Sequence, residues 1–232
     1  MRKILPCTMA IVLLSSVSLI AQEIPQEKPE ETKIYIMPDE VKCYIRKQDR
    51  ITFCTDLAGK PITGELRKYR ENELVRRYTL NKGILNGTVI SYYINGDVLS
   101  EKPYTKGKLN GVVKTYYKNN KIESLTPYQN GVKEGVAKFY YDNGYMQEQG
   151  IYIGGKLNGQ YRLYDKTGEM VYELVFENDS LASGYCMYKK KENDDKRYKQ
   201  ELDANTLDML RKHQVALDNT IIVNGCSMKR NG

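Results

Sequence analysis

Hydrophobic and polar residues alternate along most of this chain with the period of two that is typical of half-buried β-strands. Short turn signals interrupt the alternation, among them Asn95-Gly96 and Asn143-Gly144. Asn and Gly tolerate positive φ, which the two-residue turn of a tight hairpin demands. The pattern therefore predicts an all-β protein built from short antiparallel hairpins.

The hairpins follow a repeat. The pentapeptide GKLNG occurs at Gly107–Gly111 and again at Gly155–Gly159. Glycines recur at one position of the repeat, 23 to 25 residues apart, at Gly64, Gly87, Gly111, Gly135, Gly159 and Gly184. Five residues after each of the first five stands a tyrosine: Tyr69, Tyr92, Tyr116, Tyr140 and Tyr164. Such a period is typical of stacked supersecondary units. Residues 64–188 are therefore predicted to form about five hairpins in an elongated antiparallel meander, with GKLNG connecting one hairpin to the next.

The flanking segments differ from the repeat. Residues 33–63 hold three short β-rich runs, KIYIM, VKCYI and ITFCT, which predict an N-terminal β cap. Residues 189–232 begin with the charged connector KKKENDDKRYKQE, followed by a predicted helix over Asn205–Leu217 with Asp203 as its N-cap. The apolar run Thr220–Val223 is expected to form a strand, and this tail is expected to cover the open edge of the last hairpins.

The N-terminus has the pattern of an export signal. Residues 1–21 combine the basic start MRK with a short apolar stretch that ends in small residues, and cleavage is expected near Ala21. An uncleaved N-terminal membrane helix is the alternative. Residues 22–32 are charged and proline-containing with little apolar content, so a flexible linker is expected. The predicted location is the periplasm, the cell envelope or the medium.

The recurring pattern NGxxxxYYxNGxxxxxxxYxNGKLxG resembles the MORN repeat, in the variant found in bacterial proteins named YwqK-type antitoxins. The resemblance spans about Gly59–Tyr188. The first unit departs from it, with Arg70 at the second tyrosine, and the last departs with NDSLASGYCMYKKK; atypical end units suit the caps of a solenoid. The resemblance implies binding or scaffolding, an antitoxin role in proteins of that name and lipid contact in some relatives.

Charge enters the picture through one position of the repeat. The chain has 36 Lys and Arg against 29 Asp and Glu, a formal charge of +7. Basic residues stand three positions after most repeat glycines, on the same strand face as the tyrosines because side chains alternate. The candidate binding residues are Lys114, Lys138, Arg162, Tyr116, Tyr140 and Tyr164. The opposite, packed face is predicted to hold Leu66, Val89, Val113, Ala137 and Tyr161. The alternative is a solvated face whose tyrosines only pack on each other.

Cysteines are the remaining candidates for chemistry. Four follow the leader, and an even number in an exported chain suggests disulfides. Three pairings are possible, of which Cys43–Cys54 and Cys186–Cys226 are favoured; four free buried thiols are the alternative. The spacing does not suit zinc, and His213 is the single histidine, so no metal site, cofactor or catalytic set is predicted.

These patterns favour an exported, non-enzymatic repeat protein that binds or scaffolds a protein or glycan at the envelope, with no nucleic-acid partner. One alternative is an antitoxin that neutralises a partner toxin, and another is a binder of anionic membrane surfaces.

Overall fold

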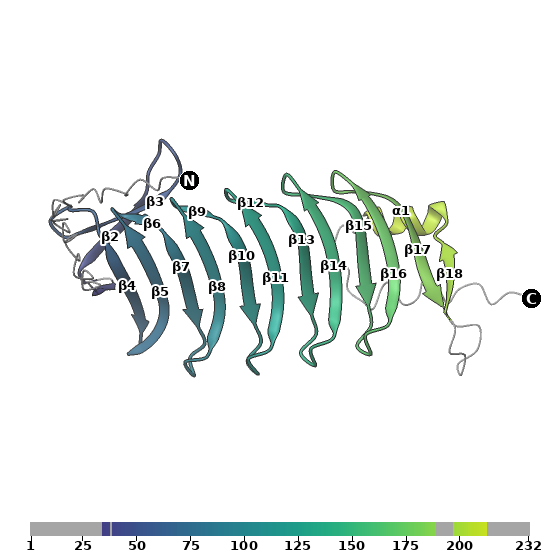
Figure 1. Ribbon diagram of the computed structural model, residues 1–232, viewed down its shortest axis with the longest axis horizontal. Coiled ribbons are helices and arrows are strands. Elements are labelled where there is room, and N and C mark those ends of the chain that lie inside the picture. The colour runs from purple at the N-terminus through teal and green to yellow at the C-terminus, as the bar shows by residue number, and fades with distance from the viewer. Residues whose placement is uncertain (1–33, 38, 189–196, 213–232) are drawn as a thin grey trace, which may run out of the picture. The chain divides into compact units, whose positions relative to one another are not determined.

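The computed structural model describes residues 34–37, 39–188 and 197–212, all within the compact unit Thr32–Gly232 (Figure 1). The predicted signal peptide and linker, His213, Cys226 and the predicted strand Thr220–Val223 lie outside the described residues. The described residues include no helical segment with the length and hydrophobicity that a membrane crossing requires.

The described chain forms eighteen strands of one sheet and one helix. The strands of the N-terminal cap are β1 (Ile34–Met37), β2 (Val41–Ile45) and β3 (Thr52–Asp56). The strands of the repeat are β4 (Gly64–Arg70), β5 (Glu73–Asn81), β6 (Ile84–Leu85), β7 (Gly87–Tyr92), β8 (Val98–Thr105), β9 (Lys108–Leu109), β10 (Gly111–Tyr116), β11 (Ile122–Gln129), β12 (Val132–Lys133), β13 (Gly135–Tyr140), β14 (Met146–Ile153), β15 (Lys156–Tyr164), β16 (Met170–Glu177) and β17 (Ser180–Tyr188). The chain then forms β18 (Tyr198–Glu201) and α1 (Ala204–Lys212).

The long strands pair antiparallel in chain order, which confirms the predicted meander. Each hairpin has an outgoing strand and a return strand: β4–β5, β7–β8, β10–β11, β13–β14 and β15–β16. Each return strand then pairs with the outgoing strand of the next hairpin, so the hairpins follow one another along the sheet (Figure 1). The short strands β6, β9 and β12 pair with the end of the preceding return strand, and a break separates each from the outgoing strand that follows.

The two kinds of turn differ from the sequence prediction. The Asn-Gly segments form three-residue loops: in the first of them Gly96 has positive φ, and the Tyr93 N–H donates to the Asp97 carbonyl at 2.8 Å. The two-residue turns, with positive φ at both positions, lie in the connectors, as at Lys106-Gly107. The prediction of two-residue turns at the Asn-Gly segments was therefore wrong. Asn95 Oδ1 accepts the backbone N–H of Asp97, and Asn143 Oδ1 accepts that of Tyr145. This role needs no positive φ at the asparagine.

Hydrogen bonds between neighbouring turns hold successive hairpins together at both ends of the strands. Asn119 Nδ2 donates to the Asp142 carbonyl at 3.0 Å, and Asn143 Nδ2 donates to the Lys166 carbonyl at 2.8 Å, each one repeat further along. At the connectors, the Gly131 N–H donates to the Leu109 carbonyl at 2.7 Å. The repeated Asn and Gly residues therefore serve contacts between units as well as turns within them.

The predicted packed face is confirmed. The five residues two positions after the repeat glycines are all buried: Leu66, Val89, Val113, Ala137 and Tyr161. Their neighbours in the middle of this face are small and buried too, including Ser91, Ser100, Ser124 and Thr126.

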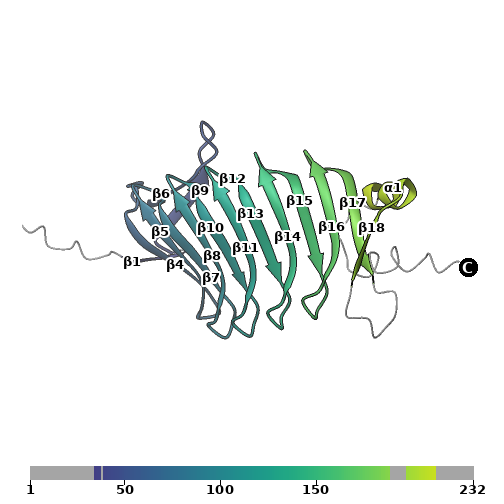
Figure 2. The same cartoon turned by 45° about the vertical axis from the view of Figure 1, so that its right-hand side comes forward.

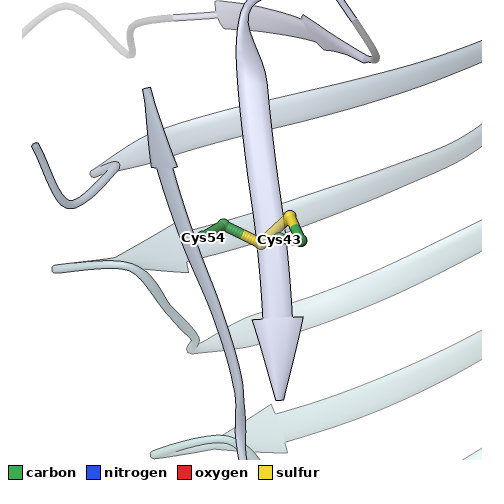
Figure 3. Close-up of a disulfide and its surroundings, with 2 residues drawn as sticks. All are labelled: Cys43 and Cys54. Atoms are coloured by element: carbon green, nitrogen blue, oxygen red, sulfur yellow. A yellow bond between two sulfur atoms is a disulfide. The ribbon is translucent and has the colours of Figure 1, made fainter. Parts of the chain in front are cut away.

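A cap covers the N-terminal end of the packed face. The β2–β3 hairpin joins the sheet through β3 and β6, and Val41, Cys54 and Ile62 pack on Leu66 and Leu80 in one buried cluster. A disulfide joins Cys43 on β2 to Cys54 on β3 (Figure 3). Strand β1 pairs with β4 in parallel, which is the exception to the antiparallel order.

At the C-terminal end, the helix and an unforeseen strand complete the sheet. The segment expected to be a charged connector contains β18, which pairs with β17 and so lies on the edge of the last hairpin. Figure 2 shows α1 beside these strands. The helix starts after Asp203, whose Oδ1 accepts the Thr206 N–H at 2.8 Å, so the predicted N-cap is confirmed. Leu207 and Leu210 pack on a core cluster that includes Leu163, Leu174 and Cys186.

One carboxyl group is held in this partly apolar region. Glu148 accepts a hydrogen bond from the hydroxyl of Tyr161. Burial raises the pKa of Glu148 above its usual value, although the bond from Tyr161 opposes that shift. The Tyr161 ring in turn lies over Gly150, where an added Cβ would come within 2.5 Å of the ring carbon Cδ2. The ionised form of Glu148 therefore carries a desolvation cost in the folded state.

We expect Glu148→Gln to resist urea better than the wild type at pH 7, because an amide still accepts the Tyr161 bond without a buried charge. Since the folded carboxyl binds its proton at higher pH than the unfolded one, the wild type gains stability relative to Glu148→Gln as pH falls from 7 towards the pKa of the unfolded carboxyl. The difference between the two proteins should narrow over that range in urea titrations followed by circular dichroism. An unchanged difference would show that Glu148 does not titrate as described.

Candidate functional site

The candidate residues lie on the sheet face opposite the packed face. We call it the tyrosine face and define it by the residues three and five positions after the repeat glycines: Arg67, Ile90, Lys114, Lys138, Arg162, Tyr69, Tyr92, Tyr116, Tyr140 and Tyr164. Lys114 and Tyr116 on β10 are close enough to affect each other's pKa, and Glu101 on the neighbouring strand β8 lies beside both. The two positions therefore share a face, as the alternation predicts.

The return strands bring carboxylates into the row of cations. Glu101 on β8 lies opposite Lys114 on β10, with Nζ and Oε2 3.2 Å apart. Glu173 on β16 lies opposite Arg162, with Nη2 and Oε1 3.3 Å apart. Reading one strand of each hairpin had indicated a row of cations; the folded row also contains the carboxylates of Glu101 and Glu173, beside Lys114 and Arg162.

These pairs shift the titration of their members. A hydrogen bond to Glu101 raises the pKa of Lys114. Hydrogen bonds from Lys199 first and then Arg162 lower the pKa of Glu173. Lys138 differs, because its cross-strand neighbours are Leu125 and Gln149 and no ion pair to it occurs among the described residues. Lys138 is thus the candidate cation with the least compensated charge.

The candidate tyrosines form a second row, nearer the hairpin loops. All are partly buried, and each is paired across the hairpin with an aliphatic residue or methionine: Leu74, Val98, Ile122, Met146 and Met170. Burial is the main cause that raises the pKa of Tyr116. The row therefore combines partly exposed tyrosines with aliphatic and methionine side chains, a composition suited to binding.

The second tyrosine of each doublet has a different role. Tyr93 OH donates to the Tyr116 carbonyl at 2.7 Å, and Tyr117 OH donates to the Tyr140 carbonyl at 2.6 Å. Tyr141 OH donates to the Tyr164 carbonyl at 2.9 Å. Each bond joins one repeat to the next, so the doubling of tyrosine is explained by the stacking of hairpins.

A third row, nearer the connectors, was missed in reading the sequence. Val112 and Val136 are 44% and 42% exposed, although they belong to long strands. Pro127 and Ile151 are their cross-strand partners on the same face. The signal was a valine one position after Gly111 and Gly135, and the two valines become neighbours on one face only when their hairpins are aligned. Apolar residues exposed in a row are a common mark of interaction surfaces.

The structure places the cysteines as follows. Cys43 and Cys54, paired in the sequence prediction, are joined. Cys186 lies on β17 in the C-terminal core, and its predicted partner Cys226 is outside the described residues. Within the same described ranges, no three His, Cys, Asp or Glu side chains gather as metal ligands would.

Comparison with known proteins identifies part of the repeat. Residues 109–130 and 133–153 match the family model of the MORN repeat variant. The matched segments run from the end of β9 through β11 and from the end of β12 through β14, one repeat each. A search of curated proteins finds no match to this chain.

Proposed function

We propose that this chain is an exported protein that binds a partner protein at the cell envelope through the tyrosine face. The proposal of export rests on the sequence pattern of residues 1–21. The proposal of binding rests on the MORN repeats of the variant type. MORN repeats are commonly involved in binding, and theirs is a family of non-catalytic repeats. The proposed contact residues are Lys114, Lys138, Arg162, Tyr116, Tyr140 and Tyr164, together with Val112 and Val136.

The observation that carries the proposal is the order of the three rows. A central row, in which Lys114 and Arg162 are paired with carboxylates, lies between a tyrosine row and a row with two exposed valines. Anionic polymers and membranes favour uncompensated cations, whereas Lys114 and Arg162 have carboxylate neighbours here. A mixed surface of aromatic, aliphatic and paired charged groups matches the anatomy of protein interfaces. A protein partner therefore fits the face better than a polyanion.

The test is site-specific photocrosslinking in the native host, with a benzophenone amino acid at Val112 or Val136. The matched control places it at Leu57, which is 59% exposed on the N-terminal cap. We expect protein adducts from the two valine positions in clear excess over Leu57. Equal yields would contradict the assignment of the face, and adducts with lipid alone would identify a membrane-surface binder.

Once the partner is identified, Val112→Glu with Val136→Glu should weaken the affinity of this protein for the partner by about tenfold or more. Two carboxylates would then be buried in the interface in place of two apolar side chains. Leu57→Glu should leave affinity unchanged. Titration calorimetry with the purified partner measures both, and a double variant with wild-type affinity would exclude this row from the interface.

Export is tested separately, by cell fractionation and N-terminal sequencing. We expect a chain that begins at or near Gln22 outside the cytoplasm. An intact chain that begins at Met1 in the cytoplasm would refute export, and a toxin-like partner captured there would make the antitoxin role the better description.

A further inference from the structure

A cavity of about 350 Å³ lies on the packed face, opposite the tyrosine face, between the N-terminal cap and the first two hairpins. Its floor comes from β4, β5, β7 and β8, and Thr52 and Cys54 of β3 contribute to its wall. The volume is near the lower end of the range for small-molecule sites, about 300–1,000 Å³. The cavity therefore has the size to hold one small ligand.

Two cations line this cavity without a carboxylate among the lining residues. They are Arg76 on β5 and Lys102 on β8. Arg76 Nε donates to Ser91 Oγ at 3.1 Å, and no ion pair to Arg76 or Lys102 occurs within the described ranges. Lys68, directly opposite Arg76 across β4–β5, adds a third positive charge to the same face. Like charges placed opposite each other destabilise a sheet. The Lys68–Arg76 pair therefore carries a cost in folding stability that an anion bound between the cations would reduce.

These cations are exceptions within the repeat. In later hairpins, the position of Lys102 is taken by Thr126, Gly150 and Leu174, each paired with the same position of its outgoing strand. The position of Arg76 is likewise taken by Ser100 in the second hairpin. The stacking of repeats therefore does not require either charge. On the tyrosine face, in contrast, Lys114 and Arg162 have the carboxylates of Glu101 and Glu173 beside them.

The rest of the cavity supplies hydroxyls and an apolar wall. Tyr78 and Tyr104 lie beside the cations, and Arg76 is close enough to Tyr104 to oppose the rise that burial causes in the pKa of that tyrosine. Leu66, Leu80 and Val89 complete the floor. Guanidinium, ammonium and phenol groups donate hydrogen bonds to oxyanions, while the aliphatic residues exclude water from an apolar body.

We infer that this cavity is a binding site for a small amphipathic organic anion, whose acidic group contacts Arg76 and Lys102 and whose apolar body lies against Leu66, Leu80 and Val89. The site is on the other face from the proposed protein interface and does not depend on it. A compact aromatic acid and a free fatty acid share this chemistry.

The probe is 8-anilinonaphthalene-1-sulfonate, an anion on an aromatic body whose fluorescence rises in apolar surroundings. We expect saturable binding to the purified protein, and about tenfold weaker binding by the variant Arg76→Met with Lys102→Met. The control variant, Lys108→Met with Lys118→Met, removes two charges from exposed positions outside the cavity and should bind as the wild type does. Circular dichroism and thermal melting confirm that all three proteins are folded.

Competition on the wild-type protein tests the same inference without a variant. At constant ionic strength, octanoate and benzoate should displace the probe, whereas acetate and inorganic phosphate should not. Displacement by octanoate alone would identify an acyl-chain site, and displacement by benzoate alone a site for compact acids. Equal displacement by phosphate and octanoate would refute the apolar part of the inference. Equal probe binding by both double variants would refute the role of Arg76 and Lys102.

Discussion

Leu163→Ala is expected to lower the free energy of unfolding by about 3–4 kcal/mol, the cost of truncating a leucine in a fully packed core. The Leu163 side chain is 0% exposed and belongs to the cluster formed by the last hairpins, β17 and the residues around α1. Truncation removes apolar contacts and leaves a cavity in the cluster that Leu163 shares with Leu202, a residue between β18 and α1. Urea denaturation followed by circular dichroism measures the loss.

Ile153→Ala is the matched control, because it removes a similar aliphatic group from a side chain that is 53% exposed. Its cost should stay below about 1 kcal/mol. Since each unit of a repeat protein contacts mainly its neighbours, hydrogen exchange in Leu163→Ala should accelerate in β15–β17 and change little in β4–β5. A loss of stability equal to that of Ile153→Ala would contradict the assignment of this core.

Removing the disulfide of the N-terminal cap is expected to have the second largest effect. Cys43→Ala with Cys54→Ala should cost about 2–3 kcal/mol, since the bond closes a loop with a sequence separation of 11. The bond also joins the two strands that wall the cavity of Arg76 and Lys102. We therefore expect weaker binding of the fluorescent anion as well as a lower midpoint of urea unfolding.

Peptide mapping under non-reducing conditions provides the control for that experiment, because it shows whether Cys43 and Cys54 are joined in the purified protein. A variant as stable as a wild type that carries the bond would contradict the predicted contribution. Unchanged anion binding in a destabilised variant would show that the cavity does not depend on the cap for its shape.

The sequence predicted most of the architecture because the repeat is encoded locally. Alternation placed Val113 and Ala137 on the packed face, and both are buried. Asp203 was recognised as a helix N-cap from its position before a run with helical spacing.

Strand β18 and the turn types were missed for different reasons. The strand β18 lies in a segment rich in charge and poor in apolar residues, and it forms because the free edge of β17 provides backbone partners. The turn types were exchanged because Asn95 can serve either as a positive-φ residue or as a side-chain acceptor, and its neighbours decide which.

The sequence by itself determined the antiparallel hairpins, their period and which residues of each outgoing strand face the core, because alternation and turn chemistry act within a few residues. Only the tertiary structure decided which residues meet across strands. Register places Glu101 beside Lys114, and it gathers Arg76 and Lys102 under the β2–β3 hairpin. Cross-strand register depends on bulges, turn lengths and the docking of the cap, so charge balance on one face and a cavity on the other arise from contacts that no single stretch of sequence specifies.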